Sequence, residues 1–294
     1  MNFAGKTFDF LKRFLILSVL VVALSLLSFY TVNVKAVAMP FYDLQPQNLV
    51  LRSSFFTSYS KSTDERKHNI ALASKSINNT FVDVNGEFSF NYTVGERTKK
   101  RGYKEAKIIV GGEFVDGVGG GVCQVSTTLY NAVLLAGLKV IEYHPHSLPV
   151  SYVAPSFDAM VNSSWADLKF VNNTHNPIII KTFANGEKLS VEIWGQKMSE
   201  GYVRESVITK TLPPLEDKVT FDDGGLYPEL YEGEFKQVRW GNSGYLSEGY
   251  LIKVVGGKKV KIKIRSDKYS PTRGLIVWGK AKKPVLDESL WLAP

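Results

Sequence analysis

The hydrophobic pattern of the chain begins with residues 14–34, an apolar segment that carries no charge and follows two lysines and an arginine. A helix of this length spans about 30 Å, the thickness of the hydrocarbon core of a bilayer. Basic flanks stay in the cytoplasm, so we expect residues 1–38 to form a cytoplasmic tail and a single-pass membrane anchor, with the rest extracytoplasmic. Ala-Val-Ala at 36–38 leaves a cleaved signal peptide as the alternative.

Helical and strand-like patterns then follow one another. A capping-box pattern, Ser-Thr-Asp-Glu, precedes apolar residues at helical spacing and predicts a helix over residues 63–77. Asn-Gly pairs at 85–86 and 185–186 each separate two strand-like runs and predict hairpins. Residues 39–60 are expected to be an irregular or extended lead-in. Further strand-like runs lie at 107–110, 113–115, 138–144 and 165–172.

A second helix is expected directly after the glycine-rich run Gly-Val-Gly-Gly-Gly-Val-Cys at 117–123. Val125, Leu129 and Val133 fall at helical spacing, and Gly137 is placed to end the helix. The patterns together predict an α+β domain over residues 39–198, in which a cysteine-bearing helix packs on a mostly antiparallel sheet.

The last third of the chain is rich in β-strand residues and glycine. Residues 199–294 are therefore expected to be a linker followed by a small all-β module. Val260, Ile262 and Ile264 alternate with basic residues, which predicts a strand with one apolar and one basic face. We expect the basic run at 258–268 to be a solvated face, with contact to acidic wall polymers or lipid headgroups as the alternative.

Composition restricts the chemistry further. The 294 residues are 44% hydrophobic, which is typical of a globular chain with a core. The net charge of +8 is spread along the sequence, so nucleic acid is not an expected partner. Cys123 is the single cysteine, which excludes an intramolecular disulfide and a zinc site built mainly from thiolates. No cofactor is expected.

Cys123 is the candidate nucleophile. It lies at the start of the second helix, where free N–H groups and a partial positive charge favour a thiolate. The helix rises about 20 Å from this cysteine, and the following strand returns about 20 Å, which brings His144 level with the thiol. His146 would share that face if the chain stays extended through Pro145. Either imidazole is expected to be the general base, in an arrangement similar to that of transglutaminase-like and papain-related folds.

The acid that would orient the base is left open between Asp158 and Asp167. Asp167 alternates with Ala166 and Leu168, whose apolar face would direct it away from the thiol. Structural histidines, or a metal held by Cys123 and both histidines, are the alternatives to catalysis. The groups expected to bind substrate or receive an oxyanion surround the helix start. They are Gly120, Gly121, Gln124, Ser126 and Thr127.

Two long strings, GGGVCQVSTTLYNA at 119–132 and YHPHSLPVSYV at 143–153, resemble the VanW family over about residues 52–195. The segment from Gly249 to Gly279 resembles the later half of a G5 module. The resemblance implies a cell-envelope setting in Gram-positive bacteria and a link to peptidoglycan, since the family takes its name from an accessory gene of vancomycin-resistance clusters. It supplies no reaction. With the candidate site, it predicts a thiol acyl-transfer or hydrolytic enzyme acting on peptidoglycan. A non-catalytic wall-binding or scaffolding protein is the alternative.

Overall fold

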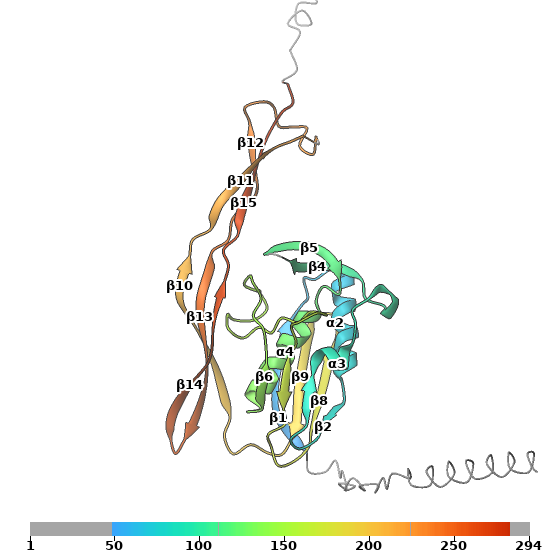
Figure 1. Cartoon of the computed structure of the whole chain (residues 1–294), viewed down its shortest axis with the longest axis vertical. Helices are drawn as coiled ribbons and strands as arrows, with labels where there is room; N and C mark the ends of the chain where they lie inside the picture. The colour runs from blue at the N-terminus through green and yellow to red at the C-terminus, as the bar shows by residue number, and fades with distance from the viewer. Residues whose placement is uncertain (1–48, 111, 224, 283–294) are drawn as a thin grey trace, which may run out of the picture. The chain divides into compact units, whose positions relative to one another are not determined.

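The computed structural model describes residues 49–110, 112–223 and 225–282 (Figure 1). These residues are mostly β-sheet with few helices. The expected anchor at 14–34 lies outside the described residues. Within the described part, the helices are too short or too polar to cross a membrane. The expected domain limits at 38 and 198 stay predictions.

A four-stranded antiparallel sheet in the order β1-β9-β8-β2 forms the base of the N-terminal domain. Alternate residues of β9 (Leu189, Val191 and Ile193) are fully buried, because successive side chains of a strand point to opposite faces. The Asn185-Gly186 turn joins β8 to β9, with a positive φ at Gly186, and the two strands pair antiparallel, so this hairpin prediction is confirmed. The lead-in contributes a regular strand, β1. The strand bounds are Val50–Ser58 (β1), Thr80–Val82 (β2), Ile178–Ala184 (β8) and Lys188–Gly195 (β9).

Two helices, α2 (Asp64–Ile77) and α4 (Val122–Leu135), cover one face of this sheet (Figure 1). α2 packs on β8, α4 packs on β1 and β9, and the two helices contact each other. The Thr63 hydroxyl caps α2 by accepting from the backbone N–H of Arg66. Gly137, with φ +67°, follows the end of α4. The cysteine-bearing helix therefore packs on an antiparallel sheet, as expected.

The prediction of a hairpin at Asn85-Gly86 is wrong. β2 joins the four-stranded sheet, whereas β3 (Glu87–Ser89) pairs with β7 (Lys169–Val171) in a second sheet. The reason is that Asn85 donates its backbone N–H to Asn172, and Asn172 donates back to Gly86. The turn is thereby bound to a distant segment. Directly after β3 the chain forms the short helix α3 (Phe90–Val94).

The strand that was expected to carry His144 is shorter than predicted. β6 (Lys139–Glu142) ends two residues earlier and pairs with β7, completing the sheet β3-β7-β6. His144 follows in irregular chain, where its carbonyl accepts from the N–H of Met160. Two shorter elements precede α4 along the chain. They are the 3₁₀ turn η2 (Lys99–Arg101) and the hairpin of β4 (Glu105–Val110) and β5 (Glu113–Val118).

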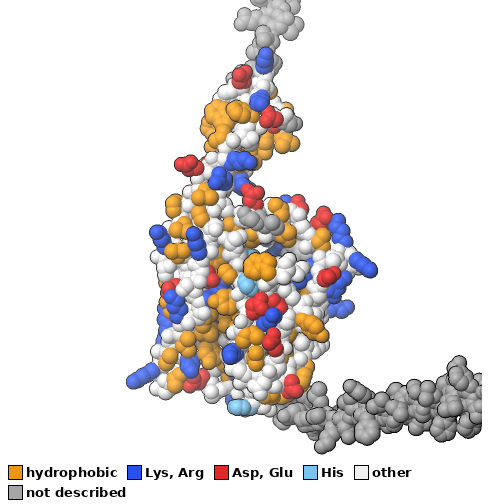
Figure 2. All heavy atoms as spheres, viewed as in Figure 1, with side chains coloured by type: hydrophobic (Ala, Val, Ile, Leu, Met, Phe, Trp, Pro, Cys, Tyr) orange, Lys and Arg blue, Asp and Glu red, His pale blue; other side chains and the backbone are white. Residues whose placement is uncertain are grey.

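The C-terminal part consists of two three-stranded sheets, β10-β13-β14 and β11-β15-β12. We call residues 202–278 the β module. Leu251 of this module belongs to the main hydrophobic core. On the face drawn in Figure 2, basic side chains are scattered among acidic and apolar ones. The strand bounds are Tyr202–Leu212 (β10), Leu215–Phe221 (β11), Phe235–Arg239 (β12), Gly244–Val255 (β13), Lys258–Tyr269 (β14) and Arg273–Trp278 (β15).

The strand predicted around Val260 is confirmed as β14, but its two faces differ from expectation. Val260 and Ile262 are 38% and 40% exposed, so the apolar face is not covered there. Arg265, expected on a solvated basic face, is only 4% exposed. Its guanidinium reaches Asp158, far away in the sequence. Burial of this charge is possible because carboxylates and carbonyl oxygens surround it.

Candidate active site

The glycine-rich run forms a tight turn that sets the start of α4. The backbone N–H of Gly119 donates to Lys104, and Asn69 donates its side-chain amide to the carbonyl of Gly120. A Cβ at Gly120 would lie 2.7 Å from backbone atoms of Ala106, so only glycine permits this approach. The turn therefore fixes the helix start against β4.

The Cys123 thiol lies in the first turn of α4 and is half-buried. Its Sγ donates to the carbonyl oxygen of Val161 at 3.3 Å. Burial by itself raises the pKa of the thiol, but the hydrogen bond and charge of His146 outweigh this effect and lower it. A cysteine with a lowered pKa presents more of the nucleophilic thiolate near neutral pH.

His146 links the thiol to a carboxylate. Its ring is 5% exposed, and its Nδ1 lies 2.7 Å from Oδ2 of Asp158, which is 1% exposed. The same oxygen accepts the backbone N–H of His146 at 2.7 Å. Because Asp158 occupies Nδ1, Nε2 remains for the thiol. Burial lowers the pKa of His146, but Asp158 and Cys123 together raise it to about 9. The structure thus brings together a thiol, an imidazole and a carboxylate in the order of a triad.

Asp158 is itself held by two residues of β14. Tyr269 donates its hydroxyl to Oδ1 of Asp158. Arg265 donates to the Asp158 carbonyl at 2.6 Å and lies 3.4 Å from Oδ1. Burial would raise the pKa of Asp158, but the hydrogen bonds of His146 and the charge of Arg265 lower it. Sequence reasoning missed both β14 residues, because neither lies in a motif with the cysteine.

The β module also contacts the loop that leads to Asp158. Ser156 donates its N–H to the Tyr269 hydroxyl at 2.7 Å, and its Oγ lies 2.7 Å from Oγ of Ser247. A Cβ at Gly249 would come within 2.7 Å of the Ser156 carbonyl, so this glycine permits the close approach. The position of the acid therefore depends on strands that lie about a hundred residues further along the chain.

The structure does not bring His144 to the thiol. Its Nε2 pairs with Oε1 of Glu142 at 3.1 Å, and its ring makes an edge contact with Trp165. The expectation that both histidines share one face is wrong, because the alternation of a strand ends with β6 at Glu142. Among the described residues, no three His, Cys, Asp or Glu side chains are grouped to hold a metal ion.

Asp167 is buried at another place. Its Oδ2 accepts from the Ser89 hydroxyl at 2.6 Å, and its Oδ1 accepts from the N–H of Asn91 at 2.8 Å. These contacts tie it to the start of α3. Of the two acids left open by the sequence, Asp158 is the one that reaches an imidazole.

Three of the residues expected to meet substrate face inward. Gln124 donates its side-chain amide to Thr57 and Ser58, and its N–H to Gly121. Ser126 and Thr127 are fully buried and bind the backbone of Ala159. Their side chains hold the segment that leads to Val161.

Gly120 and Gly121 remain at the start of α4, where the N–H of Val122 donates to Gly119. Within the described residues, the N–H of Cys123 has no protein partner. This amide is the donor that could receive an oxyanion.

Tyr152 is a further residue of the site that sequence reasoning missed. It is half-buried, and burial followed by the charge of Cys123 raises its pKa. The sequence signal that could have identified Tyr152 was its place within the string YHPHSLPVSYV around His146.

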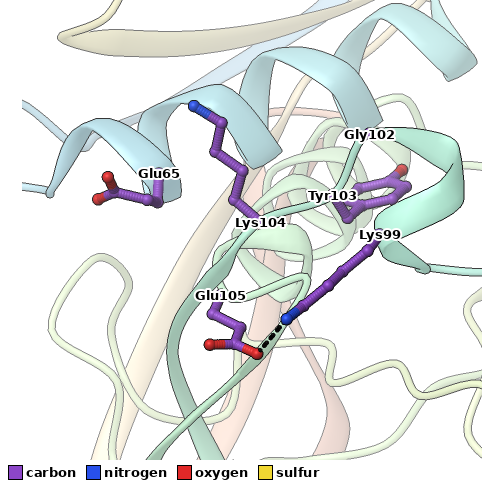
Figure 3. A pocket seen from close by; sticks show the side chains of 6 residues that line it. All are labelled: Glu65, Lys99, Gly102, Tyr103, Lys104 and Glu105. Carbon is purple, nitrogen blue, oxygen red and sulfur yellow. Dashed lines mark ion pairs between the residues drawn. The ribbon is translucent and has the colours of Figure 1, made fainter.

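A separate pocket of about 450 Å³ lies at the start of α2, beside η2 and β4 (Figure 3). It is lined by mixed charges, among them the ion pair of Lys99 and Glu105, and by none of the triad residues.

Comparison with known proteins assigns the domain that carries this site. Residues 65–194 match the family model described as VanW like protein. This part of the chain is similar to the VanW family. We refer to it below as the VanW-like domain. It includes Cys123, His146 and Asp158 but not Arg265 or Tyr269.

Two curated relatives match about half of this chain. "Uncharacterized protein YoaR" of Bacillus subtilis (strain 168) is 41% identical over 151 residues, which cover 51% of this chain and 50% of that protein. "Vancomycin B-type resistance protein VanW" of Enterococcus faecalis (strain ATCC 700802 / V583) is 27% identical over 158 residues, which cover 49% and 58%. The chain thus spans between half and three-fifths of the length of these relatives.

Two solved structures are similar to a smaller part. "IgA1 Protease G5 domain structure" is 20% identical, with a TM-score of 0.19, and the match covers 29% of this chain and 93% of that one. "Crystal structure of HP0197-G5" is 18% identical, with a TM-score of 0.16, and the match covers 28% and 100%.

Proposed function

We propose that this protein is an extracytoplasmic cysteine enzyme that transfers or hydrolyses acyl groups of peptidoglycan peptides. The observation that carries the proposal is the convergence of Cys123, His146 and Asp158. One imidazole nitrogen lies 2.7 Å from a buried carboxylate, and the ring interacts with the one cysteine of the chain. A nucleophile, a base and an orienting acid are what acyl transfer requires.

The chemistry proceeds through a thioester. The Cys123 thiolate attacks the carbonyl carbon of an amide, and a C–S bond forms as the carbonyl electron pair moves onto oxygen. The free N–H of Cys123 receives this oxyanion. As the oxyanion collapses, the C–N bond breaks and the amine leaves with the proton of His146. Water or a second amine then loses a proton to His146, attacks the thioester and releases the thiolate.

The cell envelope is the proposed setting. Its support is the VanW-like domain, together with a relative described as a vancomycin resistance protein, because vancomycin resistance concerns the cell wall. The uncharged segment at 14–34 supports a membrane anchor in the same compartment. A reduced single cysteine outside the cell is exposed to oxidation, so its retention at a helix start fits a functional thiol.

The test compares three variants on purified sacculi and on the thiol itself. We expect the wild-type protein to change the muropeptide profile seen by mass spectrometry, and Cys123→Ala and His146→Gln to abolish the change. His144→Gln is the matched control, because it removes a nearby imidazole that does not meet the thiol. Turnover by Cys123→Ala, or a wild-type thiol that iodoacetamide fails to label below about pH 8, would contradict the proposal.

A wall-binding protein without catalysis is the second candidate. The β module exposes large aromatic side chains, among them Phe221, Phe235 and Trp240 at 55%, 58% and 74%. Exposed aromatics of this kind are frequent at binding surfaces. Sacculus binding that persists in Cys123→Ala, with no muropeptide change by the wild type, would favour this candidate.

A further inference from the structure

Two arginines bracket the glycine turn that leads into Cys123. The stem of Arg66, from α2, lies beside Gly121, where a Cβ would come 3.0 Å from its Cγ. The stem of Arg97 lies beside Gly119, because a Cβ added to Gly119 would come 3.0 Å from the Cβ of Arg97. The two side chains therefore reach the start of α4 from two different segments.

Both guanidinium groups are partly desolvated and interact electrostatically with Cys123. Burial lowers the pKa of Arg66, and the charges of Tyr152 and Cys123 oppose this effect. Burial likewise lowers the pKa of Arg97, and Cys123 is the largest opposing charge. A half-buried cation gains most from an anion placed next to it, because its hydration is already reduced.

Neither guanidinium forms a direct ion pair with a carboxylate in the described part of the chain, although the charge of Asp167 acts on Arg97. Arg66 donates to the Ser62 hydroxyl at 2.8 Å. Arg97 donates to Oδ1 of Asn91 at 2.6 Å and weakly to the carbonyl of Gly95 at 3.4 Å. All these acceptors are neutral, and no Asp or Glu among the described residues forms an ion pair with either arginine. By contrast, Arg265, which holds Asp158, pairs with two carboxylates.

We propose that Arg66 and Arg97 form the carboxylate-binding subsite of the enzyme, so that its substrate is a peptide with a free carboxylate next to the bond attacked by Cys123. This assignment rests on the proposed function, for which it names the substrate class. Guanidinium groups bind carboxylates through paired, charge-assisted hydrogen bonds, which suits them to orient a substrate.

Iodoacetate and iodoacetamide test the subsite without knowledge of the substrate. Both reagents alkylate the Cys123 thiolate and displace iodide, but only iodoacetate carries a carboxylate. We expect the rate constant of iodoacetate, divided by that of iodoacetamide, to fall about tenfold in the double variant Arg66→Gln/Arg97→Gln. This size follows from the usual strength of hydrogen bonds to charged groups. A change in thiolate population slows both reagents equally, so it cancels in the ratio.

Arg101→Gln is the matched control. It removes the same charge from an exposed arginine of η2, and we expect it to leave the ratio unchanged. An unchanged ratio in the double variant, or an equal fall in the control, would overturn the subsite. Failure of the thiol to react faster than free cysteine with iodoacetamide would instead contradict the proposed function.

A second measurement uses the wild-type protein alone. We expect N-acetylalanine to slow iodoacetamide labelling of Cys123 more than N-acetylalaninamide does, because only the acid has a carboxylate. Equal protection by the acid and the amide would contradict the subsite even if the double variant did not fold.

Discussion

Asp158→Asn is the substitution that distinguishes a working triad from a cluster of buried polar groups. Asp158 accepts two hydrogen bonds from His146, each 2.7 Å long. Against the opposing effect of burial, Asp158 and Cys123 raise the pKa of His146 from 6.5 to about 9. This rise corresponds to about 3 kcal/mol in favour of the imidazolium.

The asparagine keeps the shape of the side chain but carries no charge. Cys123 contributes part of this rise and burial opposes it, so the net value of about 3 kcal/mol sets the order of magnitude of the loss. We therefore expect the population of the thiolate–imidazolium pair near pH 6 to fall by about a hundredfold. The assay is the rate constant of iodoacetamide labelling measured from about pH 5 to about pH 9. The rate constant rises with pH as the thiolate forms, and we expect this rise to occur at higher pH in the variant.

Asp167→Asn is the matched control. Asp167 is also buried, at 6% exposed, but it binds Ser89 and Asn91. We expect this variant to lower the free energy of unfolding in urea and to leave the pH profile of labelling unchanged. If Asp158→Asn folded with an unchanged profile, or if the control shifted it equally, Asp158 would not act on the thiol.

Tyr269→Phe removes the hydroxyl that joins Asp158 to the loop before it, and we expect a loss of about 1–3 kcal/mol in urea unfolding. Tyr250→Phe, whose hydroxyl binds Glu248 of the same strand, should change the stability little. Gly120→Ala places a methyl group 2.7 Å from the β4 backbone. We expect the free energy of unfolding to fall by about 1–3 kcal/mol and the thiol to be labelled more slowly. Gly201→Ala, with open space around it, should change neither quantity. Cys123→Ala should make stability fall with rising pH above about 6.5, relative to the wild type, as measured by urea unfolding across that range.

The direction of this last effect follows from proton counts. A group whose pKa is raised in the folded state stabilises the protein below its unfolded pKa, and this contribution is lost as the pH rises through the folded value. His146, raised from 6.5 to about 9, behaves in this way. In the wild type the lowered pKa of Cys123 offsets the effect, since folded and unfolded chains then bind the same number of protons. A Cys123→Ala curve that stays parallel to the wild type would contradict a charged His146.

The local elements near the cysteine were predictable because their signals are local. The capping residue of α2, the glycines before α4 and Gly137 after it act within one turn of helix, so the sequence predicts both helices. The Asn185-Gly186 hairpin was predictable for the same reason. The first Asn-Gly pair failed, because Asn172, far along the chain, determines where each strand goes.

The site was predictable in its chemical classes but not in its individual partners. Cys123 could be named from the helix start, whereas His144 and His146 could not be separated by spacing. β6 ends before them, and the irregular chain directs one ring to Glu142 and the other to Asp158. Strand alternation supplies no information once pairing has stopped.

The sequence by itself determined that a single cysteine stands at the start of a helix, with candidate bases and acids following it along the chain. The tertiary structure decided which of them meet: it buried His146 against Asp158, and it brought Arg265 and Tyr269 from β14 to hold that carboxylate. The physical reason is that helix caps and turns depend on neighbouring residues, whereas a buried charge is stable only where distant strands supply its hydrogen bonds.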